Sequence, residues 1–484
     1  MKYLNKTIVE LHELLIKKEV TPYDLALEAI ENAKQDTNNA FETICEKEAL
    51  EFASSLKEVE EDNYFWGIPF VAKDNFSTKG ILTTGSSDIL KDYVPVFDAT
   101  VIKKLKEKKA VLIGKTTLDE LAMGGQGMTS HKGYTYNPYD PSHTYMIGGS
   151  SCGSASAMAG GIIPFALGSD TGDSVRKPAT FGGLVGFKPS WGRISRYGLF
   201  PFAPSMDHVA YFTRSVEDSA LALSVLEGQD DFDMTSSYRK TNNYFASLSK
   251  DLKGKKIAVI KELMDCLHNE TILNAFNESL SYLKDAGAEV DYVSMDRSLL
   301  GAIYGTYLVI SCSEATSNNA CLDGVKYGPR NNELSSYEEI MVDARSKGFG
   351  SQVKRRFVVG SYSLLAENQN DCFLKAQKAR RIIVNKVNEI LSSYDAIYLP
   401  ASGKTKNPFA GEKSTEDSTI IENHLAIANF AGLPSLTLPI GKDGEFPFGA
   451  NITCRAFDEQ AVLDIAYTIE SRTGLKNIVA KGDK

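Results

Sequence analysis

Two serines in a run of small residues, and one lysine after an apolar stretch, have the types and spacing that suit nucleophilic chemistry. The run extends from Gly148 to Gly183 and contains Ser150 and Ser174 among glycines, alanines and further serines. Small residues let a backbone approach a ligand closely, and successive amides in such a turn can bind an anion. Lys73 directly follows the apolar residues 68–72. These are the components of a serine nucleophile that works without histidine.

Attack on an amide requires a base that takes the serine proton and fixed donors that hold the resulting oxyanion. Ser174 has the stronger context, because the backbone amides of Thr171, Gly172, Asp173 and Ser174 can form an anion-binding nest after an apolar strand. A lysine acts as a base only when it is neutral, and burial favours that form. Alone, such a serine is more typical of a turn and such a lysine of a solvated charge. Together they predict Ser174 as nucleophile, Lys73 as base and Ser150 as the relay between them.

The elements that must position these residues alternate between strand and helix patterns, which favours an α/β fold. We predict one large domain over residues 1–484, with a mixed, mostly parallel central sheet covered by helices. Its N-terminal helices occupy about residues 1–60, one of them beginning at Thr21 and Pro22, and the catalytic segment is 148–183. Polar segments 228–250 and 402–418 are predicted to be surface loops rather than domain boundaries. Strands are expected at 67–71, 110–113, 162–167, 256–260, 289–293, 396–399 and 435–438, and a helix at 271–283.

Composition excludes several classes of function. The 484 residues carry a net charge of −9, which lacks the basic surplus that nucleic acids attract. The seven cysteines have no paired spacing, and neither they nor the histidines form a metal-ligand pattern. No apolar stretch has the length of a membrane span, and no secretory signal begins the sequence. We therefore expect a cytoplasmic protein without membrane contact and without a metal or cofactor of its own.

Three segments, in this order, resemble the amidase signature family. They are KDN at Lys73, GGSSCGS from Gly148 and GSDTGDSVRKP from Gly168. The resemblance implies the amidase signature fold and a Ser-Ser-Lys triad, with Ser174 as the acyl-ester nucleophile and Ser150 and Lys73 as the relay.

Further segments resemble one branch of that family, the A subunits of glutamyl-tRNA(Gln) amidotransferases. They are DELAMGG from Asp119, SEATSNNACLDGVKYG from Ser313 and ARSKGFGSQVKRR from Ala344. The resemblance implies a glutaminase that releases ammonia from glutamine. It also implies that Tyr307, Arg356 and Glu422 recognise the α-amino and α-carboxylate groups of glutamine, with Glu422 in place of an aspartate.

The same branch implies partners for the chain. An amidotransferase B subunit would use ATP and Mg²⁺ to amidate misacylated tRNA with the released ammonia, and a small C subunit would brace the pair. The tRNA would be held mainly by the partner. The chain itself has no GxxxxGK phosphate loop, so ATP and Mg²⁺ are expected on the partner.

Two departures from the family pattern leave alternatives open. Asp173 replaces a glycine directly before the nucleophile, where its carboxylate would repel the oxyanion and favour protonated Lys73. Cys152 replaces another glycine near Ser150. A catalytically weakened scaffold subunit of the same complex is therefore one alternative. A free-standing amidase for small amides is the other.

Overall fold

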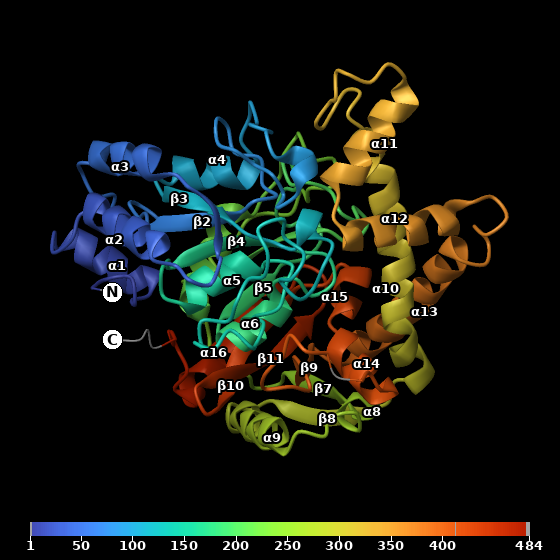
Figure 1. Cartoon of the computed structure of the whole chain (residues 1–484). Helices are drawn as coiled ribbons and strands as arrows, with labels where there is room; N and C mark the ends of the chain where they lie inside the picture. The colour runs from blue at the N-terminus through green and yellow to red at the C-terminus, as the bar shows by residue number, and fades with distance from the viewer. Residues whose placement is uncertain (1, 412, 481–484) are drawn as a thin grey trace.

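Eleven strands form one mixed sheet, in which strands from distant parts of the chain are neighbours (Figure 1). The computed structural model describes residues 2–411 and 413–480. Across the sheet the order is β1-β3-β2-β4-β6-β5-β10-β11-β9-β7-β8. The predicted α/β fold with a large mixed sheet is confirmed. The strands are β1 (Phe41–Ile44), β2 (Pro69–Lys73), β3 (Val111–Thr116), β4 (Phe165–Asp170), β5 (Val185–Lys188), β6 (His208–Thr213), β7 (Lys256–Ile260), β8 (Glu289–Val293), β9 (Ala396–Pro400), β10 (Ser435–Asp443) and β11 (Phe446–Cys454).

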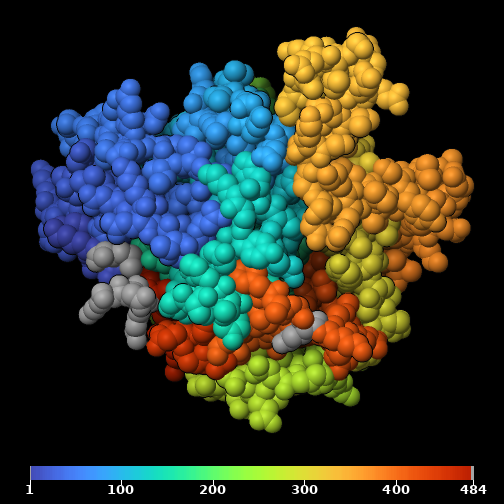
Figure 2. All heavy atoms as spheres, viewed as in Figure 1, coloured from blue at the N-terminus to red at the C-terminus, as the bar shows by residue number. Residues whose placement is uncertain are grey.

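Helices pack around this sheet. In Figure 1 the N-terminal helices α1 to α3 lie on the left and α10 to α13 on the right, and Figure 2 shows parts of the latter group as yellow-orange and orange protrusions. No helix in the described part of the chain is long and apolar enough to cross a membrane. The helices are α1 (Ile8–Ile16), α2 (Pro22–Lys34), α3 (Glu46–Ser55), α4 (Thr100–Glu107), α5 (Cys152–Ala159), α6 (Arg176–Gly182), α7 (Val216–Leu226), α8 (Lys261–Met264), α9 (Glu270–Asp285), α10 (Arg297–Asn318), α11 (Tyr337–Gly348), α12 (Ser351–Leu364), α13 (Phe373–Ser393), α14 (Glu416–Asn423), α15 (Ala426–Phe430) and α16 (Glu459–Thr473), with short 3₁₀ turns η1 (Asp88–Leu90), η2 (Glu120–Ala122) and η3 (Asn319–Cys321).

Lys73, the predicted base, is the last residue of β2, an interior strand of the sheet. Strand β2 lies between β3 and β4 and runs parallel to both, with Ala72 opposite Lys115 and Leu167. All residues of β2 and β4 are buried, which explains why these strands read as continuous apolar runs in the sequence. Because neighbouring parallel strands end at the same edge, Lys73 at the end of β2 and Ser169 near the end of β4 lie together.

The predicted excess of parallel pairings is wrong. Among the described strands, four pairings are parallel and six are antiparallel. The largest antiparallel pair, β10 with β11, is a hairpin closed by Gly444 and Glu445, and so short a connection cannot join parallel strands. Apolar runs locate strands but carry no direction, so the alternating pattern alone favoured too many parallel neighbours.

Local sequence signals are confirmed at several helices. Thr21 is the N-cap of α2, and its side chain and that of Asp24 each accept from the other's backbone amide in a capping box, with Pro22 in the first turn. Helix α9 covers the predicted 271–283, and Asn269 caps it. Helices α1, α2 and α3 all fall within the first 60 residues, where N-terminal helices were expected.

Candidate active site

Lys73 is fully buried, and its ammonium nitrogen is surrounded by hydroxyl groups. Its Nζ lies 2.7 Å from Ser150 Oγ, 3.0 Å from Ser151 Oγ and 2.9 Å from Ser169 Oγ. In the described part of the chain no carboxylate oxygen forms an ion pair with it, unlike the equally buried Lys115, which lies 3.1 Å from Asp74. Burial therefore dominates and lowers the pKa of Lys73 to about 7. A large share of this amine is neutral at neutral pH, the form that accepts a proton.

The expectation that Asp173 would keep Lys73 protonated finds no support in the site's electrostatics. The groups that most oppose the effect of burial on the pKa of Lys73 are first Cys152 and then Asp119, Asp170 and Asp207, and their combined effect leaves that pKa at about 7. Asp173 is not among the groups that shift it most.

The Lys73 cluster contains residues that sequence reasoning did not single out. Ser169 projects from β4, and its hydroxyl also accepts from Asn75 Nδ2 at 3.0 Å. Ser151 donates to the Ser169 carbonyl at 3.1 Å. Both serines stood inside the motifs that were recognised, so their motif positions were the available signal. The peptide bond between Gly149 and Ser150 is cis.

The loop between β4 and α6 carries the predicted nucleophile. Ser174 is buried, and its carbonyl accepts the Ser151 amide at 3.2 Å, which joins the two serine-bearing segments. The Ser174 hydroxyl has no hydrogen-bond partner among the described residues, and neither do the backbone amides of Gly172, Asp173 and Ser174. Three successive free amides beside a free hydroxyl suit an oxyanion formed by attack of that hydroxyl.

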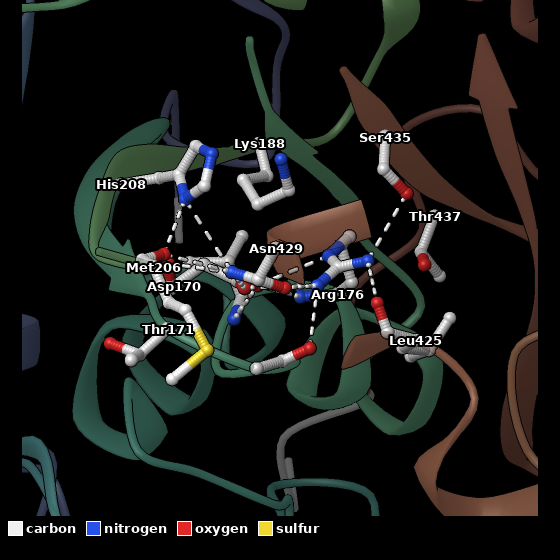
Figure 3. Close-up of polar contacts among 12 residues, drawn as sticks. Asp170, Thr171, Arg176, Lys188, Met206, His208, Leu425, Asn429, Ser435 and Thr437 are labelled. Atoms are coloured by element: carbon white, nitrogen blue, oxygen red, sulfur yellow. Dashed lines mark hydrogen bonds and ion pairs between the residues drawn. The ribbon is translucent and has the colours of Figure 1, made fainter. Parts of the chain in front are cut away.

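A buried ion pair holds this loop in shape (Figure 3). Arg176 Nη2 donates to Asp170 Oδ1 at 3.0 Å and to the Gly172 carbonyl at 2.7 Å, so the guanidinium spans the two ends of the turn. Burial alone would raise the pKa of Asp170, but the charge and hydrogen bonds of Arg176 outweigh it and hold that pKa far below its usual range. Asp170 Oδ2 also accepts the amide of Val175 at 2.9 Å. The Arg176–Asp170 ion pair and its hydrogen bonds to the loop backbone, called the brace below, thus hold the Ser174 loop in shape.

The C-terminal part of the chain completes this brace. Asn429 Nδ2 donates to Asp170 Oδ1 at 3.0 Å, and Arg176 donates to Asn429 Oδ1 at 2.6 Å and to the Leu425 carbonyl at 2.8 Å (Figure 3). Arg176 Nη1 also lies 3.2 Å from Ser435 Oγ. Contacts from α15 and β10 therefore fix a loop that follows β4, about 250 residues earlier.

A cavity of about 440 Å³ adjoins the Ser174 loop and gathers the residues predicted to bind substrate. Tyr307 comes from α10, Arg356 from α12 and Glu422 from α14, and all three line this cavity. Asp173 and Lys177 line it as well. A larger cavity of about 510 Å³, near Ile89 and Leu322, is lined by none of the predicted site residues.

The charged side chains of this cavity differ in whether other residues of the chain already bind them. Arg356 Nη1 is buried without a hydrogen-bond partner in the described chain, so its guanidinium is available to an anion. Glu422 forms an ion pair with Lys177 at 2.6 Å. No sequence signal linked Lys177 to Glu422, which lies 245 positions away. Among the described residues, no group of three or more His, Cys, Asp or Glu side chains could hold a metal ion.

Comparison with known proteins shows the family of this chain. A family model described as Amidase matches residues 24–463. The A subunit of the glutamyl-tRNA(Gln) amidotransferase of Pediococcus pentosaceus is 39% identical over 98% of this chain and 98% of that protein. The Streptococcus pneumoniae protein of the same name is 38% identical over 98% of this chain and 97% of its own.

A solved structure shares the architecture as well. The crystal structure of the A subunit of the Thermotoga maritima glutamyl-tRNA(Gln) amidotransferase is 34% identical, with a TM-score of 0.81 over 100% of this chain and 99% of that one. The match covers both the sheet and the segments that carry the buried lysine and the serines. The chain therefore belongs to the amidase family and is an enzyme of the amidase type, related over nearly all of its described length to amidotransferase A subunits.

Proposed function

We propose that the chain is the glutaminase subunit of a glutamyl-tRNA(Gln) amidotransferase and that it works through Lys73, Ser150 and Ser174. Ser174 Oγ attacks the side-chain carboxamide carbon of glutamine. Its proton passes to Ser150, whose own proton passes to Lys73 Nζ. Collapse of the tetrahedral intermediate returns a proton to the leaving nitrogen and expels ammonia. Water then hydrolyses the acyl-enzyme to glutamate.

One observation carries this proposal. Lys73 is a buried amine 2.7 Å from the Ser150 hydroxyl, with hydroxyl groups and no carboxylate as its near neighbours in the described chain. Two other fully buried lysines differ from it: Lys115 is paired with Asp74, and Lys188 donates to the carbonyls of Pro189 and Leu433. The unpaired amine suits a base whose partner is a hydroxyl proton. The free amides of Gly172, Asp173 and Ser174 support the proposal, because they can stabilise the oxyanion.

In the proposed complex, ammonia passes to a B subunit, where ATP and Mg²⁺ activate the glutamyl group on misacylated tRNA, and a C subunit stabilises the pair. The likeness to named A subunits supports these partners. The chain itself would contribute the glutaminase, and the B subunit would hold the nucleotide, the metal and most of the tRNA.

The test is amidation of Glu-tRNA(Gln) by the assembled complex with either glutamine or an ammonium salt as nitrogen donor. Wild-type complex is expected to use both donors. The Ser174→Ala complex is expected to lose glutamine-dependent amidation and to keep the ammonium-dependent reaction, which also shows that the variant still folds and assembles. Undiminished use of glutamine by Ser174→Ala would contradict the assignment of the nucleophile.

The same assay separates the two alternatives. A scaffold subunit without glutaminase chemistry predicts amidation by wild-type complex with ammonium salt only. A free-standing amidase predicts turnover of simple aliphatic amides by the isolated chain. Of the two departures behind the scaffold alternative, the Cys152 thiol donates to the Thr117 carbonyl at 3.7 Å.

A further inference from the structure

Three acids line the cavity beside Ser174, and they differ in how many hydrogen bonds their carboxylates already accept. They are Asp119, Asp173 and Glu422. A carboxylate has about four acceptor positions, so one whose positions are filled has no capacity left for a ligand. A cationic group of the substrate can bind only at an acid that still has free acceptor positions.

Asp119 is fully engaged by the chain around it. Its Oδ2 accepts the amides of Gln126 and Gly127 at 3.1 and 2.9 Å. Its Oδ1 accepts the amide of Met128 at 2.9 Å, and the amide and hydroxyl of Thr129 at 3.2 and 2.9 Å. This carboxylate fixes the loop that follows η2, and it has no acceptor position for substrate.

Glu422 is engaged as well, by fewer donors but including a cation. Lys177 Nζ reaches its Oε2 at 2.6 Å, Ser402 Oγ lies 2.9 Å from both oxygens, and the amide of Gly403 donates to Oε1 at 2.8 Å. These three donors engage both carboxylate oxygens, and the ammonium of Lys177 neutralises the charge of Glu422. Burial would raise the pKa of Glu422, but Lys177 outweighs it and lowers that pKa, so the ion pair persists at neutral pH. A substrate ammonium would have to displace Lys177 to bind there.

Asp173 is the remaining acid. Its side chain takes part in no hydrogen bond and no ion pair with any residue that the structure describes, although it is partly buried and lines the cavity. We propose that Asp173 binds the α-ammonium group of glutamine, in place of Glu422, whose charge Lys177 already neutralises. This inference rests on the proposed glutaminase function and extends it, because it assigns a specificity-determining role to the residue that departs from the family pattern.

The surroundings of Asp173 suit that role. Tyr307 packs close to the same turn, since a Cβ added at Gly172 would lie 2.8 Å from its ring. Arg356, with its free Nη1, supplies a separate cation for the α-carboxylate. An amino acid zwitterion would thus meet one unpaired anion and one unpaired cation, in a cavity where Asp119 is filled by hydrogen bonds and Glu422 is paired with Lys177. Burial raises the pKa of Asp173 to about 6, so the carboxylate is mostly ionised at neutral pH even before a cation binds.

The test is a binding measurement that does not depend on turnover. Isothermal titration calorimetry on the Ser174→Ala chain compares glutamine with glutaramate, which has the same amide and carboxylate but no ammonium group. We expect glutamine to bind more tightly than glutaramate. Adding Asp173→Asn should weaken glutamine binding by about tenfold or more and leave glutaramate within about twofold. Asp173→Glu, which keeps the charge, should retain most of the preference for glutamine.

Glu422→Gln in the same background is the matched control. It is expected to leave the preference for glutamine over glutaramate in place, because neither ligand contacts Glu422 in the proposed binding mode. A preference for glutamine that survives Asp173→Asn, or that is abolished by Glu422→Gln instead, overturns this inference and leaves the glutaminase proposal intact. Absence of binding by either ligand, with no glutamine turnover by wild-type complex, overturns both.

Discussion

The pKa of Lys73 makes a quantitative prediction about the pH dependence of catalysis. Burial lowers that pKa to about 7, and the base is active only in its neutral form. About one eleventh of Lys73 is then neutral at pH 6, one half at pH 7 and about ten elevenths at pH 8. We therefore expect kcat to rise about tenfold from pH 6 to pH 8 and to reach a plateau above it. A lysine with the ordinary pKa of 10.5 would instead give a rise of about a hundredfold over this range, with no plateau.

The assay is glutamate release at saturating glutamine, with the partner subunits present and the ionic strength constant. Saturation matters because kcat reports groups in the substrate complex, whereas kcat/KM would also include the titration of free Asp173. The groups that face Lys73 directly are the hydroxyls of Ser150, Ser151 and Ser169, which do not titrate in this range. A kcat that stays constant from pH 6 to pH 8, or climbs steadily to pH 9, would refute the reasoning. Lys73→Arg should be inactive at every pH, since its guanidinium stays protonated.

Three further predictions follow from contacts around the site. Arg176→Met should lower the free energy of unfolding by about 3–5 kcal/mol, measured by denaturant titration, because it leaves Asp170 buried without its cation; an unchanged midpoint would contradict the bracing role. Arg356→Gln should raise the KM for glutamine by about tenfold or more with a smaller change in kcat, because it removes the cation for the α-carboxylate; equal losses in both would argue against that role. Gly149→Ala should fail to give folded protein by circular dichroism, because its Cβ would overlap Asp119 Oδ2, which the loop amides hold in place; Gly125→Ala, with nothing within 4 Å, should fold normally.

Sequence patterns located seven of the described strands, including the largely exposed β8, and missed four, including the fully buried β5 and β6. Strands β2, β4, β7 and β9 were predicted close to their observed places, because strands covered on both faces carry uninterrupted apolar residues. Strands β1, β5, β6 and β11 were missed. β1 is only partly buried, β6 begins with His208, and β11 contains Pro447, which in a sequence argues against a strand. The direction of each strand depends on tertiary pairing, which no local pattern encodes.

In the candidate site, too, some features could be predicted from the sequence and others could not. Lys73, Ser150 and Ser174 were recognised because each lies in a short motif of characteristic residues, and the structure places Lys73 against Ser150. Their catalytic roles remain predictions. The engagement of Glu422 by Lys177 was not foreseeable, because it joins two side chains from helices far apart in sequence. A sequence likewise reveals that Asp173 is present but not whether its carboxylate has found a partner.

The contacts that hold the Ser174 loop come partly from residues late in the sequence. This affects when, during synthesis, the loop can take its final shape. Lys73, Ser150 and Ser174 all leave the ribosome well before Leu425, Asn429 and Ser435, and domains generally form from the N-terminal end as synthesis proceeds. Until those late residues arrive, Arg176 lacks the carbonyl, amide and hydroxyl that hold it against Asp170. If the proposed function holds, a polypeptide that lacks residues 425–435 would carry Lys73, Ser150 and Ser174 with the Ser174 loop not yet fixed, and glutaminase activity would require those later residues.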